Sequence, residues 1–288
     1  MSESKRKMGR RKRFLAEHPD CYSCGGIGRA TTIDHVPPQA CFPKGYVPEG
    51  FEFPACKQCN EGAAKVDQIF GYYSLCFDFG VSKTNLADDA KQKKKLLQGI
   101  LNNYPDALPD LTTAYPIHQV GSVITPYPAA IVLDTPPALK EVFKMMGQKL
   151  THAIYMRETG KILSAAHRFV SSCYQPQRMG TETLTSYFNS LQLPNKSVGD
   201  RPNIKSYGDR FRYISGVKDD GDFLLYASQF GKGLILWSMV CGQNMKIPEV
   251  GFLASATWSR GACGPGASGT TPHRPEEENA HGETRPSS

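Results

Sequence analysis

The sequence predicts an α+β protein in which a small metal-binding module near the N-terminus precedes a larger body of helices and antiparallel strands. Two Cys-x-x-Cys pairs within residues 21–59 predict the module. Two long segments with apolar residues at helical spacing, and three β-rich runs separated by short turns, predict the body. We place the module at residues 16–80 and the body at residues 85–260.

Length and composition restrict the class of protein. A chain of 288 residues with 40% hydrophobic residues is long enough to bury a sizeable core. No run reaches about eighteen consecutive apolar residues, and no apolar segment follows the charged N-terminus, so we expect neither a membrane helix nor a signal peptide. A cytoplasmic, reducing location is the expectation, and the odd number of nine cysteines then favours metal ligation over disulfides.

The first residues carry most of the net charge of +7. Their basic side chains are Lys5, Arg6, Lys7, Arg10, Arg11, Lys12 and Arg13. Clustered Lys and Arg bind phosphates by releasing counterions and need no fixed geometry to do so. We therefore interpret residues 1–15 as a disordered basic arm that contacts the backbone of DNA, or of RNA as an alternative. A purely solubilising tail is the competing interpretation.

Two helices are expected in the body. Residues 86–104 and 136–160 both carry apolar residues in one stripe, and Gly160 ends the second helix. His152 and His167 lie in this region, and we interpret both as structural histidines rather than ligands.

Antiparallel hairpins are expected near the end of the body. The runs "RFRYISGV", "FLLYASQF" and "LILWSMVC" are separated by Asp- and Gly-rich turns. No catalytic motif stands out in the body, so a scaffold or recognition role is expected for it. Residues 261–288 are poor in large apolar residues and are predicted to be disordered, which makes His273 and His281 poor site candidates.

The cysteine pairs predict a structural zinc site. Cys21 with Cys24, and Cys56 with Cys59, offer four thiolates in the two-pair spacing that tetrahedral Zn²⁺ prefers. The module is rich in Gly and Pro and has little core of its own, so zinc is expected to hold it together. Cys41 has no partner at this spacing and is expected to be a small buried residue.

Zinc does not explain the polar residues between and after the cysteine pairs. A closed four-thiolate site has no open position for water, so chemistry would need a second metal with hard oxygen ligands. "TTIDHVPP" predicts a strand that carries Asp34 and His35, and "CNEGAAKVDQIF" predicts a helix with Asn60 in its first turn. The second cysteine pair would fix that helix start, so that the three side chains converge.

These residues resemble the HNH endonuclease superfamily, in the version with a four-cysteine zinc site that is typical of the phage endonuclease VII group. The resemblance covers about residues 21–70. Four features agree in order: a Cys pair, Asp-His followed by "VPP", a second Cys pair, and an Asn directly after its last cysteine. The resemblance implies a ββα-metal, or treble-clef, module with phosphodiesterase activity.

The resemblance also implies roles for individual residues. His35 would be the general base, and Asp34 with Asn60 would hold a catalytic Mg²⁺ or Mn²⁺ beside the scissile phosphate. The chemistry agrees, because a neutral imidazole accepts a proton near pH 7 and a divalent ion stabilises charge on the phosphate.

The third residue of the family motif is different here. Many members have a histidine about nine residues after the Asn, and this position is Ile69. The third metal ligand therefore stays open between Glu61, Asp67 and Gln68, whereas Lys65 is expected to contact a phosphate.

Two functions from different classes remain open at this level. The first is a metal-dependent endonuclease that cuts DNA. The second is a zinc-dependent nucleic-acid-binding module without activity. The sequence leaves the biological substrate and the oligomeric state undecided, and it predicts no membrane partner.

Overall fold

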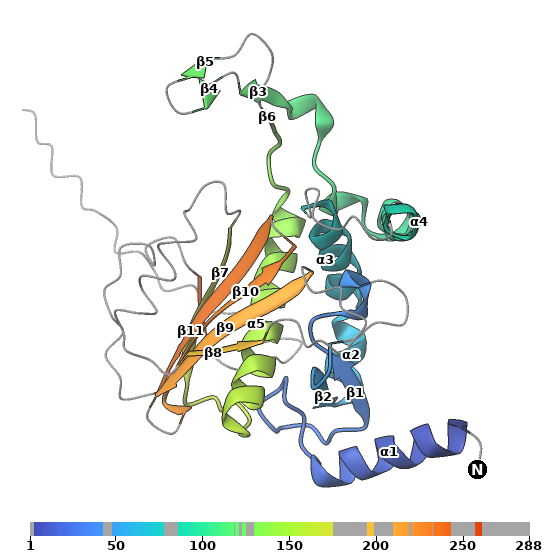
Figure 1. Cartoon of the computed structure of the whole chain (residues 1–288), viewed down its shortest axis with the longest axis vertical. Coiled ribbons are helices and arrows are strands. Elements are labelled where there is room, and N and C mark those ends of the chain that lie inside the picture. The colour runs from blue at the N-terminus through green and yellow to red at the C-terminus, as the bar shows by residue number, and fades with distance from the viewer. Residues whose placement is uncertain are drawn as a thin grey trace, which may run out of the picture.

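The computed structural model of the chain describes residues 3–42, 48–77, 86–117, 119–120, 123–124, 130–174, 195–198, 210–218, 221–231, 233–242 and 257–260. Within them the fold is α+β, as predicted, with helices and antiparallel sheets (Figure 1). The helices are α1 (Glu3–Glu17), α2 (Lys57–Gly62), α3 (Ala64–Cys76), α4 (Leu86–Asn103) and α5 (Pro137–Thr159), with the 3-10 turns η1 (Gln39–Cys41), η2 (Pro105–Ala107) and η3 (Leu111–Thr113). The strands are β1 (Thr32–His35), β2 (Glu52–Ala55), β3 (Tyr115–Ile117), β4 (Gln119–Val120), β5 (Val123–Ile124), β6 (Ala130–Val132), β7 (Arg168–Tyr174), β8 (Asn195–Val198), β9 (Phe211–Lys218), β10 (Phe223–Phe230), β11 (Leu234–Cys241) and β12 (Thr257–Arg260).

The main sheet has six strands in the order β12-β7-β11-β10-β9-β8. The three runs predicted as successive hairpins are β9, β10 and β11, which pair antiparallel along their full lengths. Among the described residues between them, Asp222, Gly231 and Gly233 lie in turns, as the sequence indicated. The hairpin prediction for this part of the body is confirmed.

Helix α5 lies against this sheet and connects it to the rest of the molecule. It packs on β7 and β11 on one side and on α3 on the other (Figure 1). Gly147 allows the close approach to the sheet, since a Cβ there would lie 2.6 Å from Oγ of Ser171. The helix ends as predicted at Gly160, whose φ of 70° is the left-handed cap conformation that glycine adopts without strain.

Helix α4 also begins and ends close to its predicted bounds. Its buried Asp89 pairs with Arg210, which directly precedes β9. Its Gln92 donates to the carbonyl oxygens of Ala40 and Phe42 at 2.8 Å each. The helix therefore links the sheet to the N-terminal module.

The N-terminal module does not have a separate core. Phe51 of this module lies 5.3 Å from the ring of Phe211 and 5.8 Å from that of Tyr213, both in β9. Arg157 of α5 stacks over Phe51 at 4.2 Å, donates to the Gly50 carbonyl and also bonds the Tyr213 hydroxyl. One hydrophobic cluster thus runs through the module and the body, on both sides of the expected boundary near residue 80.

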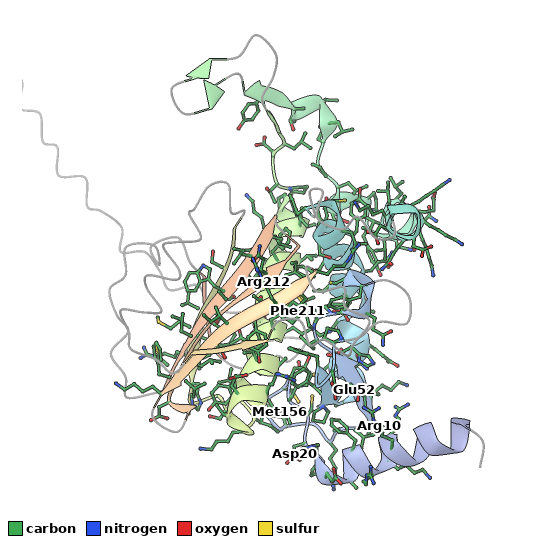
Figure 2. All side chains as sticks on the ribbon, in the orientation of Figure 1. Arg10, Asp20, Glu52, Met156, Phe211 and Arg212 are labelled. Carbon is green, nitrogen blue, oxygen red and sulfur yellow. The ribbon has the colours of Figure 1, made fainter. Side chains whose placement is uncertain are left out.

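The first helix corrects one prediction. Residues 3–17, expected to be mostly a disordered arm, form α1. Lys, Arg, Leu, Met, Ala and Glu are strong helix formers, and no proline interrupts them. The helix is also fixed to the module, because Arg10 pairs with Glu52 at 2.9 Å (Figure 2). Arg11 donates to the Thr31 carbonyl. The charge pattern predicted exposure correctly but not the conformation.

The small ribbons β3–β6 and β4–β5 extend away from the main sheet in Figure 1. The predicted disordered tail, residues 261–288, lies outside the described residues.

Candidate functional site

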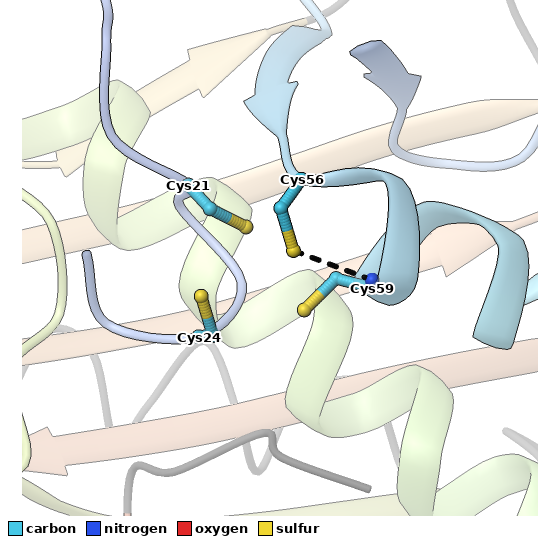
Figure 3. A group of neighbouring side chains, drawn as sticks. All are labelled: Cys21, Cys24, Cys56 and Cys59. Atoms are coloured by element: carbon cyan, nitrogen blue, oxygen red, sulfur yellow. Dashed lines mark hydrogen bonds between the residues drawn. The ribbon is translucent and has the colours of Figure 1, made fainter. Parts of the chain in front are cut away.

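The four cysteines of the two pairs come together at one point. Cys21 and Cys24 lie in a turn closed by a hydrogen bond from the Cys21 N–H to the Gly28 carbonyl at 2.9 Å. Cys56 and Cys59 lie at the start of α2, where Cys56 is the N-cap and its Sγ accepts from the Cys59 N–H at 3.4 Å. The four sulfur atoms lie within 4.8 Å of one another (Figure 3).

This cluster can hold a metal ion such as zinc. Backbone N–H groups point at the sulfurs, as in the Gly28 N–H to Cys24 Sγ bond of 3.2 Å, which favours thiolates. Gly28 also explains the tight packing, since a Cβ there would lie 3.1 Å from Cβ of Cys56. Among the residues with described positions, this is the only group of three or more Cys, His, Asp or Glu side chains with metal-binding geometry.

The start of α2 brings Asn60 next to the predicted strand. The side-chain amide of Asn60 donates to Oγ1 of Thr32 at 3.1 Å and lies 3.5 Å from the carbonyl oxygen of Ile33. Because side chains alternate along a strand, Thr32 shares its face of β1 with Asp34. Asn60 therefore lies on the Asp34 face of β1.

Asp34 is buried and fully engaged. Its side chain is 6% exposed, Tyr22 donates to Oδ2 at 2.7 Å, and the Lys149 ammonium lies 3.1 Å from Oδ1. The same contact and burial raise the pKa of Tyr22, chiefly by desolvation and then by the Asp34 charge. The Asp34 carboxylate is thus almost completely buried and is held by two donors.

Lys149 also reaches a second carboxylate. Its Nζ lies 2.7 Å and 2.8 Å from the two oxygens of Asp67 in α3. Burial raises the pKa of Asp67 to about 6. The Lys149 charge acts to lower this pKa, and the neighbouring Asp34 acts to raise it. Burial alone would lower the pKa of Lys149, but the two carboxylates outweigh it and raise that pKa, so the side chain is an ammonium.

The structure separates the three candidates for a third ligand. Only Asp67 shares a contact with Asp34, through Lys149. Glu61 is exposed and pairs with Lys57 at 3.8 Å, and Gln68 points at Gly99 of α4. Ile69, which stands where many HNH proteins have histidine, is fully buried.

His35 lies at the end of β1 beside Glu52, its partner across the β1–β2 pair. Burial lowers the pKa of His35, although Glu52 and Asp34 act in the opposite direction. Its Nδ1 is buried without a hydrogen-bond partner among the described residues. The imidazole is therefore neutral at pH 7, but the structure shows no direct contact between it and Asp34 or Asn60.

The remaining predicted residues have clear positions. Arg11, Lys12 and Arg13 are exposed on α1. Lys65, which is expected to contact a phosphate, lies 3.9 Å from Asp106 and 4.9 Å from the centre of the Tyr104 ring. Lys5, Arg6 and Lys7 belong to α1, but their side chains lie outside the described set.

Two structural predictions for buried residues are confirmed. Cys41 is 4% exposed, and His152 is fully buried with Nδ1 3.1 Å from the Tyr22 carbonyl oxygen. His167 bonds Tyr155 and Ser164 and is also structural.

The sequence reasoning missed Lys149. A signal was present, since Lys149 follows Met146 by three residues and falls on the apolar stripe of α5. A lysine on a buried stripe needs a carboxylate partner. Sequence alone could not say which carboxylate, because the two partners belong to β1 and α3.

Comparisons with protein-family models, with curated proteins and with solved structures found no match to this chain. None of the helices in the described part of the chain combines the length and apolar character needed to cross a membrane.

Proposed function

We propose that this protein is a metal-dependent endonuclease of the HNH type that hydrolyses phosphodiester bonds in DNA. One observation carries the proposal: the four-cysteine cluster fixes the start of α2 so that Asn60 lies on the Asp34 face of β1. The antiparallel pair β1–β2 followed by α2 is the arrangement that a ββα-metal, treble-clef module requires. Zinc is the metal proposed for the cluster.

The second metal would be held by hard oxygen ligands. Asp34 offers a carboxylate and Asn60 an amide oxygen, which suit Mg²⁺ or Mn²⁺ and leave positions for water and phosphate. When bound there, the ion would stabilise negative charge on the phosphate and the leaving oxygen. Lys149 lies 3.1 Å from Asp34 Oδ1, so the ion would have to share this carboxylate with the ammonium.

His35 is the proposed general base. Its lowered pKa keeps the imidazole neutral and able to accept a proton from the attacking water at pH 7. The exposed basic residues of α1 would bind backbone phosphates near His35. Arg10 holds this helix close to that residue, because it pairs with Glu52, the partner of His35 across the β1–β2 pair.

A specific observation favours a second candidate function. Both oxygens of Asp34 already have donors, Tyr22 and Lys149, so the carboxylate is compensated without any divalent ion. This arrangement would suit a zinc-dependent nucleic-acid-binding module that does not cut.

A plasmid-nicking assay separates the two. We expect purified protein with Mg²⁺ or Mn²⁺ to convert supercoiled plasmid to nicked or linear forms, and a chelator to stop the reaction. Protein that retards the plasmid in a gel but never cuts it, with any divalent ion, would favour the binding module.

A further inference from the structure

Lys149 is a charged side chain of the body that lies inside the N-terminal module. It is 6% exposed, and its ammonium lies 3.1 Å from Asp34 Oδ1 and 2.7 Å from Asp67 Oδ1. Lysine is among the residues least often buried, and burial of its charge requires paired partners. The buried face of the helix that carries it, α5, is otherwise part of the hydrophobic core.

The charges around Lys149 do not balance. One ammonium faces two carboxylates, and the remaining oxygen of Asp34 receives only the neutral hydroxyl of Tyr22. With both carboxylates ionised, the group therefore carries an excess of one negative charge. Such an excess attracts a further cation, while the ammonium already occupies part of the space between the carboxylates.

We propose that Lys149 is a positioning residue of the nuclease site: it holds Asp34 and Asp67 in place and, by competing for Asp34, sets the affinity of the site for a divalent cation. This inference rests on the proposed function, in which Asp34 is a ligand of that cation. It assigns the body a direct part in the site, beyond scaffold or recognition.

A purely structural ion pair makes a different prediction. If Lys149 only joins α5 to the module, removing it lowers stability and leaves cation affinity unchanged. If it competes for Asp34, removing it leaves the buried carboxylate of Asp34 and the partly exposed carboxylate of Asp67 free to bind a divalent cation more tightly. Removing the Asp67 charge should weaken cation binding, because Lys149 then pairs with Asp34 alone.

The test measures Mn²⁺ binding to the full-length, zinc-loaded protein by the electron paramagnetic resonance signal of free Mn²⁺. We expect Lys149→Met to tighten binding by at least about tenfold, and Asp67→Asn to weaken it by a similar factor, because a charge a few ångströms from the ion interacts with it strongly. The double variant restores the charge of the parent site and should bind Mn²⁺ within about threefold of the parent, if the two effects act on the same ion.

Thermal unfolding gives a second reading that does not depend on activity. A ligand that binds only the folded state raises its stability more when its affinity is higher. Added Mn²⁺ should therefore raise the Tm of the Lys149→Met protein more than that of the parent.

Matched controls identify the site. Asp34→Asn should remove the tight Mn²⁺ site in every background. Lys144→Met changes a partly exposed lysine of the same helix, paired with Glu141 at 3.6 Å, and should leave Mn²⁺ affinity unchanged. Zinc content shows whether the module is folded in each variant. If the Lys149→Met protein does not fold, the Mn²⁺ affinity of Asp67→Asn is compared with that of the parent instead.

Equal Mn²⁺ affinity in the parent and the folded Lys149→Met protein would overturn the inference, as would unchanged affinity in Asp67→Asn. Absence of Mn²⁺ binding in both the parent and Lys149→Met would also overturn it. A parent protein that shows the expected affinity pattern but never cuts DNA would refute the nuclease and retain the role of Lys149 in cation binding.

Discussion

The main sheet and the N-terminal module are stabilised by different interactions. Every residue of β11 and most residues of β10 are buried, so the sheet rests on apolar packing. Strand β1 has a single buried residue, the charged Asp34, and the nearby turns depend on four cysteines. The module shares the hydrophobic cluster of the body, but it adds a four-cysteine group that can hold a metal and polar contacts from the body, at Lys149, His152 and Arg157.

This difference bears on function. Apolar packing gives the sheet stability that depends little on salt, pH or metals. The module, by contrast, places its functional side chains with charges and thiolates, so its geometry responds to all three. Changes to the apolar sheet and changes to the charged and cysteine side chains of the module should therefore have separable consequences.

Loss of the metal cluster should have the largest effect. We expect about one zinc per chain in the parent, as a four-thiolate site requires, and none tightly bound in Cys56→Ser. Structural zinc contributes on the order of 10 kcal/mol to such modules, so hydrogen exchange should show residues 21–62 opening on chelation. Strands β10 and β11 should stay protected.

The control for this prediction lies in the sheet. Leu236→Ala in β11 removes a side chain that is 1% exposed and should lower the free energy of unfolding by about 2–5 kcal/mol. Its zinc content should equal that of the parent. A Cys56→Ser protein that kept full zinc content and activity would contradict the assignment of the cluster.

Removing the proposed base should have the next largest effect. We expect His35→Ala to slow cleavage by at least about 10²-fold while DNA affinity and zinc content stay near those of the parent. Asp34→Ala and Asn60→Ala should also lose activity, but higher Mg²⁺ or Mn²⁺ should partly restore them, since they affect the metal. The measurement is the nicking rate of each variant across a metal titration.

These three variants also test the mechanism as a whole. His35→Ala should show no rescue by metal, because the imidazole is not a proposed ligand. If His35→Ala cuts plasmid as fast as the parent, the mechanism proposed for this site is wrong.

The histidine that joins α5 to the module should make stability depend on pH. Burial lowers the pKa of His152 to about 4, from a usual value of 6.5. As the pH falls from 6.5 to 4, the unfolded chain takes up the proton first, so the free energy of unfolding should fall by about 3 kcal/mol in total. Above pH 6.5 this contribution should be constant.

His152→Asn isolates the effect in urea unfolding at several pH values. Asparagine keeps a donor for the Tyr22 carbonyl oxygen but does not titrate. We expect its stability to fall less steeply than that of the parent between pH 6.5 and 4. Parallel curves for the two proteins would show that the His152 proton does not contribute.

Sequence patterns predicted the parts of the fold that depend on local order. The bounds of α4 and α5, the Gly160 cap and the three hairpin strands followed from periodicity and turn residues. The cysteine cluster followed from spacing alone. Such features need no knowledge of distant contacts, which explains why they could be read correctly.

The features that sequence analysis missed depend on long-range packing. The pairing of Lys149 with Asp67 joins residues 82 positions apart, and no local pattern selects that partner. The high charge density of residues 1–15 predicted disorder, but most of these residues form α1. Their side chains favour helix, and Arg10 pairs with Glu52, a contact that no local pattern indicates. The site is therefore only partly predictable from its motif.

The smallest expected effect concerns the basic face of α1. Replacing Arg11, Lys12 and Arg13 with Gln keeps good helix formers and leaves the Arg10–Glu52 pair in place. Each lost phosphate contact lowers the slope of log affinity against log salt by about 0.9, so the slope should fall by up to about 2.7. Fluorescence anisotropy with a short labelled duplex at several salt concentrations measures this slope.

The matched control is the double variant Lys94→Gln, Lys95→Gln, which removes two exposed charges from α4 and should leave the slope nearly unchanged. Equal slopes for the α1 variant and the parent would return this helix to the role of a solubilising segment, because a helix that contacts DNA must release counterions.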